Sequence, residues 1–182
     1  MKTLETTRLI LRSFELKDLD DLYEYASVEG IGEKAGWKHH KSKTESNIIL
    51  QEFIAKDTVF AIELKENHKV IGSVGLHDIE TTDPSLKQKE LGYVVSKDYH
   101  NLGIASEATK RVIEFCFEDL KLDKLWCCHF EDNAISKRVI LKNGFKYHHT
   151  FEKDLEALNF KRFTILAYYM DKEIYDNIQI AK

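Results

Sequence analysis

The stretch His100-Asn101-Leu102-Gly103-Ile104-Ala105 separates two segments of opposite periodicity. In the run before it, Glu90 to Val95, apolar and small or polar residues alternate as they do in a strand. In the segment after it, apolar residues recur on one helical face, at Ala105, Ala108, Val112, Phe115 and Cys116. The pattern therefore predicts a strand, a short loop containing glycine, and a helix.

This loop is a candidate anion site. The first turn of a helix presents unpaired backbone N–H groups and a partial positive charge, which suit phosphate or diphosphate. Gly103 and Ala105 leave these groups unshielded, although an ordinary turn has the same pattern. The Gly-Lys-Ser/Thr of a P-loop is missing, and so are the three glycines of the dinucleotide fingerprint. The open alternatives are a plain turn and a site for another diphosphate ligand.

Composition narrows the class of protein. A chain of 182 residues predicts a single domain over 1–182, and the formal charge of −4 gives no basic bias toward nucleic acid. No apolar run approaches the roughly 20 residues of a membrane span, and the start, Met1 to Arg8, lacks a signal-peptide core. We therefore expect a cytoplasmic protein that contacts neither membranes nor nucleic acid.

The three cysteines are expected to be reduced and buried. Cys127 and Cys128 are neighbours in a predicted strand, so their side chains point to opposite faces and cannot bind one metal ion together. Together with Cys116 the chain has three cysteines, and this odd number also argues against a set of disulfides. We predict no metal site.

The flanking segments alternate between strand and helix patterns, which predicts a mixed α/β sheet in the order β-α-α-β-β-β-α-β-α-β-β. Thr44 and Asn133 are the expected N-caps, and Gly144 the expected C-cap. The region 171–180 is either a helix or a frayed tail. Strands are predicted over 8–12, 58–65, 69–77, 90–96, 125–130, 145–151 and 162–170, helices over 16–26, 44–55, 104–120 and 133–143, and irregular segments over 30–43 and 81–88.

A second motif, Asn133-Ala134-Ile135-Ser136, opens the last of these helices. Asn133 and Ser136 are three positions apart, so both can face one groove at the start of the helix. The alternative is that Asn133 serves only as an N-cap and Ser136 is an ordinary first-turn residue.

With both motifs in order, the chain resembles the GNAT N-acetyltransferases, and most closely the RimJ/RimL branch of ribosomal-protein N-terminal acetyltransferases. The resemblance implies a single-domain α/β fold with a mixed, mostly antiparallel sheet, flanking helices and a splayed central strand pair. The family commonly has Gln, Arg or Trp at the position of His100, and Gly at that of Ala105. The resemblance lies in four stretches: Thr7 to Arg12, Leu91 to Val95, His100 to Ala108, and Asn133 to Arg138 with Lys142 to Phe145.

The resemblance implies acetyl-CoA as donor and a primary amine as acceptor, either a protein N-terminus or a small amine. The neutral amine would attack the thioester directly. A backbone N–H near Val94 or Val95 would stabilise the oxyanion. The implied CoA-binding residues are Val94, Val95, His100, Asn101, Leu102, Gly103, Ile104, Ala105, Ser106, Asn133 and Ser136, with the N–H groups of 102–106 holding the diphosphate.

Two residues are the catalytic candidates. Glu90 is the leading base, because an alkyl ammonium near pKa 10 must lose a proton before it attacks; the alternative is a strand-edge charge paired with Lys87 or Lys89. By resemblance, Ser136 is the group that would hydrogen-bond the leaving sulfur. Weaker candidates for that role are Tyr93, Tyr147 and Tyr169.

Trp37, His40 and His77 are the candidate acceptor-binding residues. Trp37 beside the pair His39-His40 suits an amine through cation–π contact, or else anchors its loop. His77 ends a strand and is a second candidate base, or else a solvated histidine. Three cations in the last helix could meet the CoA 3′-phosphate or form a solvated face: Lys137, Arg138 and Lys142.

The sequence also allows other functions. The same fold could acetylate an antibiotic or a polyamine, although the basic segment 30–43 argues against aminoglycosides. A non-catalytic acyl-CoA-binding regulatory module predicts CoA affinity without turnover, and a nucleotide-binding protein predicts stabilisation by ATP. The RimJ/RimL resemblance also implies a homodimer.

Overall fold

The computed structural model describes residues 1–80 and 83–180, whose strands join into one sheet in the order β1-β2-β3-β4-β5-β6-β8-β7. Neighbouring strands are antiparallel except for β5 and β6, which are parallel. The strands are β1 (Leu4–Glu5), β2 (Leu9–Ser13), β3 (Val59–Leu64), β4 (Val70–His77), β5 (Gln88–Val95), β6 (Lys124–Phe130), β7 (Lys146–Leu155) and β8 (Lys161–Asp171). The helices are α1 (Leu19–Ala26), α2 (Lys43–Lys56), α3 (Ile104–Glu118), α4 (Ala134–Lys142) and α5 (Lys172–Ile180), with 3-10 turns η1 (Leu16–Asp18), η2 (Glu33–Ala35), η3 (Lys97–Tyr99) and η4 (Glu156–Leu158).

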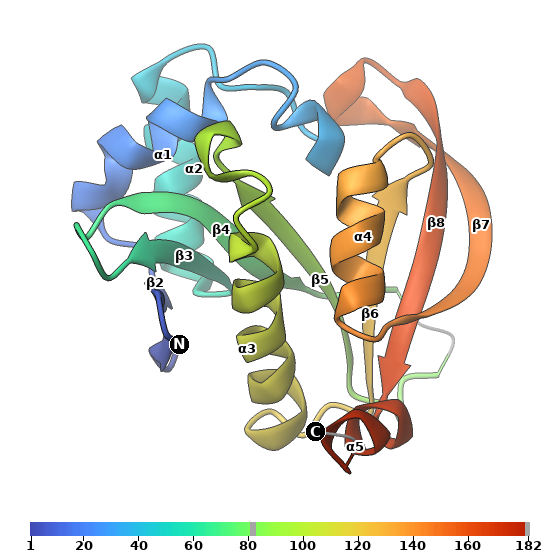
Figure 1. Cartoon of the computed structure of the whole chain (residues 1–182). Coiled ribbons are helices and arrows are strands. Elements are labelled where there is room, and N and C mark those ends of the chain that lie inside the picture. Colours follow the sequence, from blue (N-terminus) through green and yellow to red (C-terminus); the bar gives the residue numbers. More distant parts are fainter. Residues whose placement is uncertain (81–82, 181–182) are drawn as a thin grey trace.

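The helices lie on both faces of the sheet (Figure 1). The larger core lies between the sheet and α3, α4 and α5, and its α3 members include Ala108, Val112 and Cys116, as the helical periodicity predicts. The smaller core lies under α1 and α2, where Leu22 and Leu50 pack on β3 and β4. The predicted mixed α/β sheet flanked by helices is thus confirmed.

The central strands β5 and β6 separate along their length. They pair only at Gln88↔Lys124, Lys89↔Leu125 and Glu90↔Trp126. Both strands continue well past this point, β5 to Val95 and β6 to Phe130. The predicted splayed pair is therefore present, and its gap opens directly after Glu90.

Several element boundaries differ from the sequence prediction. The two-residue strand β1 is too short to show a periodicity, and β5 begins at Gln88 instead of Glu90. Helix α2 begins one residue before the predicted cap Thr44, because the side chain of Ser42 accepts a hydrogen bond from the N–H of Glu45 over 3.2 Å. The region 172–180 is helix α5 and not a frayed tail. Residues 81 and 82 of the predicted loop lie outside the described residues.

Strand β7 is longer than predicted for a physical reason. It is one of the two edge strands of the sheet and is exposed along most of its length, so its sequence lacks the alternation of a half-buried strand. Its long pairing with β8 forms the hairpin on the right of Figure 1.

Candidate active site

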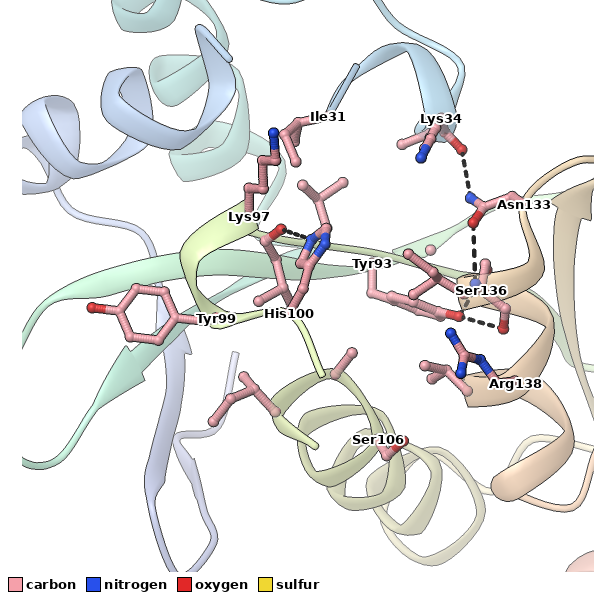
Figure 2. A pocket seen from close by; sticks show the side chains of 18 of the residues that line it. Ile31, Lys34, Tyr93, Lys97, Tyr99, His100, Ser106, Asn133, Ser136 and Arg138 are labelled. Atoms are coloured by element: carbon pink, nitrogen blue, oxygen red, sulfur yellow. Dashed lines mark hydrogen bonds between the residues drawn. The ribbon is translucent and has the colours of Figure 1, made fainter. Parts of the chain in front are cut away.

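A cleft of about 580 Å³ occupies the gap between β5 and β6. Strand β5, the loop before α3, the start of α4 and the segment around η2 all contribute to it (Figure 2). Of the residues predicted from the sequence, its lining includes Glu90, Val94, Val95, His100, Asn101, Gly103, Ile104, Ala105, Ser106, Asn133 and Ser136.

Backbone groups of β5 point into the gap. In an antiparallel pair, residues alternate between those whose N–H and C=O face the partner strand and those whose groups face away. The N–H of Ser96 donates to the C=O of Ile71 on β4 over 2.7 Å. Two residues earlier, the backbone of Val94 also faces β4, whereas the N–H groups of Tyr93 and Val95 face the gap. Of the two predicted oxyanion donors, only Val95 is therefore directed into the cleft.

The loop before α3 presents the helix N-terminus to the same cleft. Gly103 is the N-cap with φ +77° and Asn101 has φ +61°, so the loop makes two left-handed turns within three residues. His100 donates from Nε2 to the C=O of Val95 over 2.9 Å and thereby ties the loop to β5 (Figure 2). Helix geometry leaves the N–H groups of Ile104, Ala105 and Ser106 without partners inside the helix.

Two hydroxyl groups meet on the α3 and α4 side of the gap. Tyr93 reaches from β5 to α4, where its Oη lies 2.8 Å from Oγ of Ser136 (Figure 2). Burial raises the pKa of Tyr93 well above its usual range, so this phenol stays protonated and can donate. Asn133 accepts from the N–H of Ser136 over 3.1 Å and so caps the helix that carries the serine.

Glu90 lies on the opposite face of the sheet from the Tyr93 side chain, because side chains alternate along a strand. Its neighbour across the gap is Cys128 of β6, which also lines the cleft. Burial, followed by the nearby Glu90 carboxylate, raises the pKa of the Cys128 thiol above its usual range, so the thiol remains neutral. Lys89, the predicted alternative partner of Glu90, pairs instead with Asp78 over 2.6 Å.

The segment around η2 crosses above the cleft. Nδ2 of Asn133 donates to the C=O of Lys34 over 3.4 Å, which joins η2 to α4 (Figure 2). The Glu33 carboxylate accepts hydrogen bonds from the N–H of Gly30 and from the N–H and Nδ1 of His39. Burial would raise the pKa of Glu33, but these hydrogen bonds outweigh it and hold the pKa at about 2. The carboxylate therefore organises this segment as a fixed negative charge.

The structure places four predicted residues beside the cleft and not in its lining. The C=O of Leu102 accepts from Arg8, and its side chain is exposed. Trp37 packs against the smaller core, with its ring 5.2 Å from that of the buried His40, as expected of a loop anchor. The His77 ring lies over Gly92, which itself lines the cleft.

Cationic side chains surround the mouth of the cleft. Lys97 follows β5, and Arg138 and Lys142 of α4 also line it, whereas Lys137 is not part of the lining. Within the described residues 1–80 and 83–180, no group of three or more His, Cys, Asp or Glu side chains could hold a metal ion. Over the same residues, no helix is long and apolar enough to cross a membrane.

Two further residues of this cleft, Tyr93 and Cys128, carry only a weak signal in the sequence. A tyrosine at strand spacing, such as Tyr93, usually belongs to the core. Cys128 was treated as structural, although the strand period already places it on the same face as Trp126, the register partner of Glu90. Only the short pairing of β5 with β6 reveals that both line one cleft.

A cleft through a splayed strand pair, with a helix N-terminus at one end and an acid and hydroxyl groups inside, fits the class of acyl-transfer enzymes. A family model described as acetyltransferase (GNAT) domain matches residues 8–146, which is most of the chain. The chain therefore belongs to the GNAT acetyltransferase family, and the predicted family and enzyme class are confirmed.

Similar proteins agree with this assignment. The uncharacterized N-acetyltransferase YoaA of Bacillus subtilis (strain 168) is 28% identical over 148 residues, which cover 79% of this chain and 82% of the relative. A GNAT-family acetyltransferase from Bacillus anthracis has a TM-score of 0.84 at 22% identity, covering 94% of this chain and 99% of that one. A ribosomal-protein-S5-alanine acetyltransferase from Vibrio fischeri has a TM-score of 0.74 at 19% identity, covering 94% and 97%. These two structures share the fold.

Proposed function

We propose that this chain transfers the acetyl group of acetyl-CoA to a primary amine by direct attack of the amine on the thioester. One observation carries the proposal: the cleft joins an open helix N-terminus to a gap that has Glu90 on one face of the sheet and Tyr93 with Ser136 on the other. Donor and acceptor can thus approach the gap from opposite faces.

The loop and its surroundings fit the CoA diphosphate. The N–H groups of Ile104, Ala105 and Ser106 are free of helical partners, and Gly103 lacks a side chain that would cover them. Arg138 and Lys142 add positive charge along the same cleft and are candidates for the phosphates. The free N–H of Val95 can pair with a pantetheine amide or with the thioester oxygen.

The groups in the gap can remove a proton from the acceptor amine and stabilise the negative charges that form during transfer. Glu90 takes a proton from the ammonium group, which frees the nitrogen lone pair for attack on the thioester carbon. The N–H of Val95 then stabilises the oxyanion that forms. When the carbon–sulfur bond breaks, the neutral Tyr93 phenol and the Ser136 hydroxyl donate hydrogen bonds to the departing thiolate, which takes up the second proton that the nitrogen loses as the amide forms.

The acceptor is a protein N-terminus or a small amine. The N-terminal alternative and a homodimer rest on the RimJ/RimL resemblance of the four motif stretches, whereas the expected cytoplasmic location rests on the sequence composition. His77 stays a candidate on the acceptor side, because its ring lies over Gly92 beside Glu90. Trp37 and His40 would act only indirectly, by holding their loop.

The test is release of free CoA thiol from acetyl-CoA in the presence of a panel of small amines and N-terminal peptides. We expect release that depends on the acceptor, together with acetylated product by mass spectrometry. Tight CoA binding without release for every acceptor would favour a non-catalytic acyl-CoA-binding module instead.

A further inference from the structure

Arg8 of the segment before β2 sits behind the loop that precedes α3. Its Nη1 donates to the C=O of Leu102 over 3.0 Å, and its Nη2 lies 3.6 Å from the position that a Cβ on Gly103 would take. Arg8 does not line the β5/β6 cleft but lines a second hollow of about 660 Å³, which shares Gly103, Ser106 and Lys142 with the cleft. It therefore touches the proposed diphosphate loop from outside the lining of the cleft.

The same guanidinium binds a carboxylate in the first turn of α3. Nε of Arg8 lies 2.7 Å and Nη2 2.6 Å from Oε2 of Glu107. The other oxygen of Glu107 accepts from Oγ1 of Thr6 over 2.6 Å and from the N–H of Arg8 over 3.1 Å. Burial would raise the pKa of Glu107, but these partners outweigh it and lower the pKa, so the carboxylate is charged at neutral pH.

This arrangement has two consequences for an anion at the helix N-terminus. A negative Glu107 in the first turn stabilises the helix but repels a diphosphate bound there, and the Arg8 charge offsets that repulsion. The bond to Leu102 also holds a loop in which Asn101 and Gly103, on either side, are left-handed. Both effects keep the N–H groups of α3 open toward the cleft.

We propose that Arg8, through Glu107 and Leu102, is a positioning residue that shapes and electrically balances the loop for the diphosphate of the acyl donor. The proposal rests on the proposed function, because it assumes an acyl-CoA donor. It concerns residues that make no contact with the reacting atoms.

The experiment compares two donors in the Arg8→Gln variant. Acetyl-CoA carries the diphosphate, whereas S-acetylpantetheine has the same thioester without it. We expect KM for acetyl-CoA to rise about tenfold, as for loss of hydrogen bonds to a charged group, with kcat within about twofold of the parent. The kcat/KM for S-acetylpantetheine should not change. An equal fall for both donors, or no change for acetyl-CoA, would overturn the proposal.

A second variant separates positioning from direct binding. If Arg8 acts through Glu107, then adding Glu107→Gln to Arg8→Gln removes the uncompensated charge and recovers part of the affinity for CoA. No recovery would exclude the charge-balancing route through Glu107 and would overturn the proposal. Arg162→Gln is the matched control, because Arg162 makes a similar forked pair with Asp154 on the distant β7/β8 hairpin.

A binding measurement and a further variant complete the test. Calorimetric titration with CoA and with pantetheine needs no turnover, so failure of this inference and failure of the proposed acetyl transfer are distinguished. If Arg8→Gln does not fold, Arg8→Lys retains the charge and loses the fork. Arg8→Lys should then weaken the binding of CoA but not the binding of pantetheine. Equal weakening of the binding of both ligands would contradict the proposal.

Discussion

Glu90 is the residue on which the proposed proton transfer depends. Glu90→Gln keeps the size of the side chain and removes its basicity, so kcat/KM should fall about 100-fold at neutral pH, within the usual range for a general base. The loss should shrink as the pH approaches about 10, where an alkylamine is already neutral. Rates across this pH range are the measurement.

Glu52→Gln on the exposed face of α2 is the matched control for Glu90, since Glu52 pairs only with Lys56 one helical turn away. If Glu90→Gln and the parent enzyme gave the same pH–rate profile, Glu90 would not be the base. The nearby His77 would then be the next group to test.

Tyr93 and Ser136 are predicted to act on the leaving sulfur as a coupled pair. Tyr93→Phe and Ser136→Ala should each lower kcat and leave the affinity for acetyl-CoA nearly unchanged, because the thiolate forms only after bond cleavage begins. The two hydroxyl oxygens are 2.8 Å apart, so the effects in the double variant should be less than additive. Single-turnover acetyl transfer measures both.

Tyr147→Phe, at an exposed tyrosine of β7, is the matched control for Tyr93→Phe. Fully additive effects of the two substitutions in the cleft would mean that the hydroxyl groups act independently. An unchanged kcat in Tyr93→Phe would remove this residue from the mechanism.

At the residue scale, the sequence predicts which residues lie at the cleft better than it predicts the role of each residue. Gly103 and Ser136 belong to sequence motifs and Glu90 is a carboxylate on a predicted strand, and all three line one cleft. For Trp37 the sequence leaves two roles open, an acceptor wall and a loop anchor, because an aromatic residue beside histidines suits both. Only packing, which brings Trp37 against His40, distinguishes them.

At the scale of elements, the loop before α3 depends on the left-handed conformation of Gly103. Gly103→Ala adds a Cβ at φ +77°, which costs about 1–2 kcal/mol for an L-residue. Relaxation of the loop should turn the N–H groups away from the cleft and weaken CoA binding about tenfold, by the usual conversion of free energy to affinity. Calorimetric titration with CoA measures this.

Gly144→Ala provides the comparison for that loop. Gly144 has φ +88° at the end of α4, and a Cβ there would also meet Ile178 of α5. This variant should lose stability without losing CoA affinity. Equal CoA affinities for Gly103→Ala and the parent would show that the loop conformation does not matter for binding.

Elements with a clear hydrophobic periodicity were predictable from the sequence, whereas strand pairing and the ends of elements were not. The buried face of α3 follows from its spacing, and the splay of β5 from β6 came from the family resemblance alone. No periodic signal marks where two parallel strands stop pairing, because hydrogen bonding between strands leaves no trace in the order of residues. The N-cap of α2 was misplaced because Ser42 and Thr44 are both good caps.

At the scale of the whole molecule, a buried ion network ties β2 to β3 and to the start of α1. Arg12 binds Asp18 through two hydrogen bonds of 2.7 and 2.9 Å, and its Nε binds Glu63. His68 contacts the other oxygen of Glu63. Burial would raise the pKa of Glu63, but the bonds from His68 and Arg12 outweigh it and lower the pKa.

A group with a lowered pKa stabilises the fold above its ordinary pKa and loses that contribution as the pH falls through the folded value. Glu63→Gln should therefore lower the free energy of unfolding at pH 7 by about 3 kcal/mol, as for a broken buried pair. The difference from the parent should narrow below the ordinary pKa of 4.5. Urea unfolding at pH 7 and pH 4 measures this, with exposed Glu66→Gln as control. A difference independent of pH would exclude an ionic role for Glu63.

The most direct test of the whole account is a crystal structure with a thioether analogue of acetyl-CoA that cannot transfer its acetyl group. We predict the diphosphate at the N–H groups of 104–106 and the acyl carbonyl oxygen about 3 Å from the N–H of Val95, a hydrogen-bond distance. Glu90 should then face the acyl carbon from one side and Tyr93 with Ser136 the sulfur from the other. An analogue whose acyl end lies outside the gap between β5 and β6 would contradict the account.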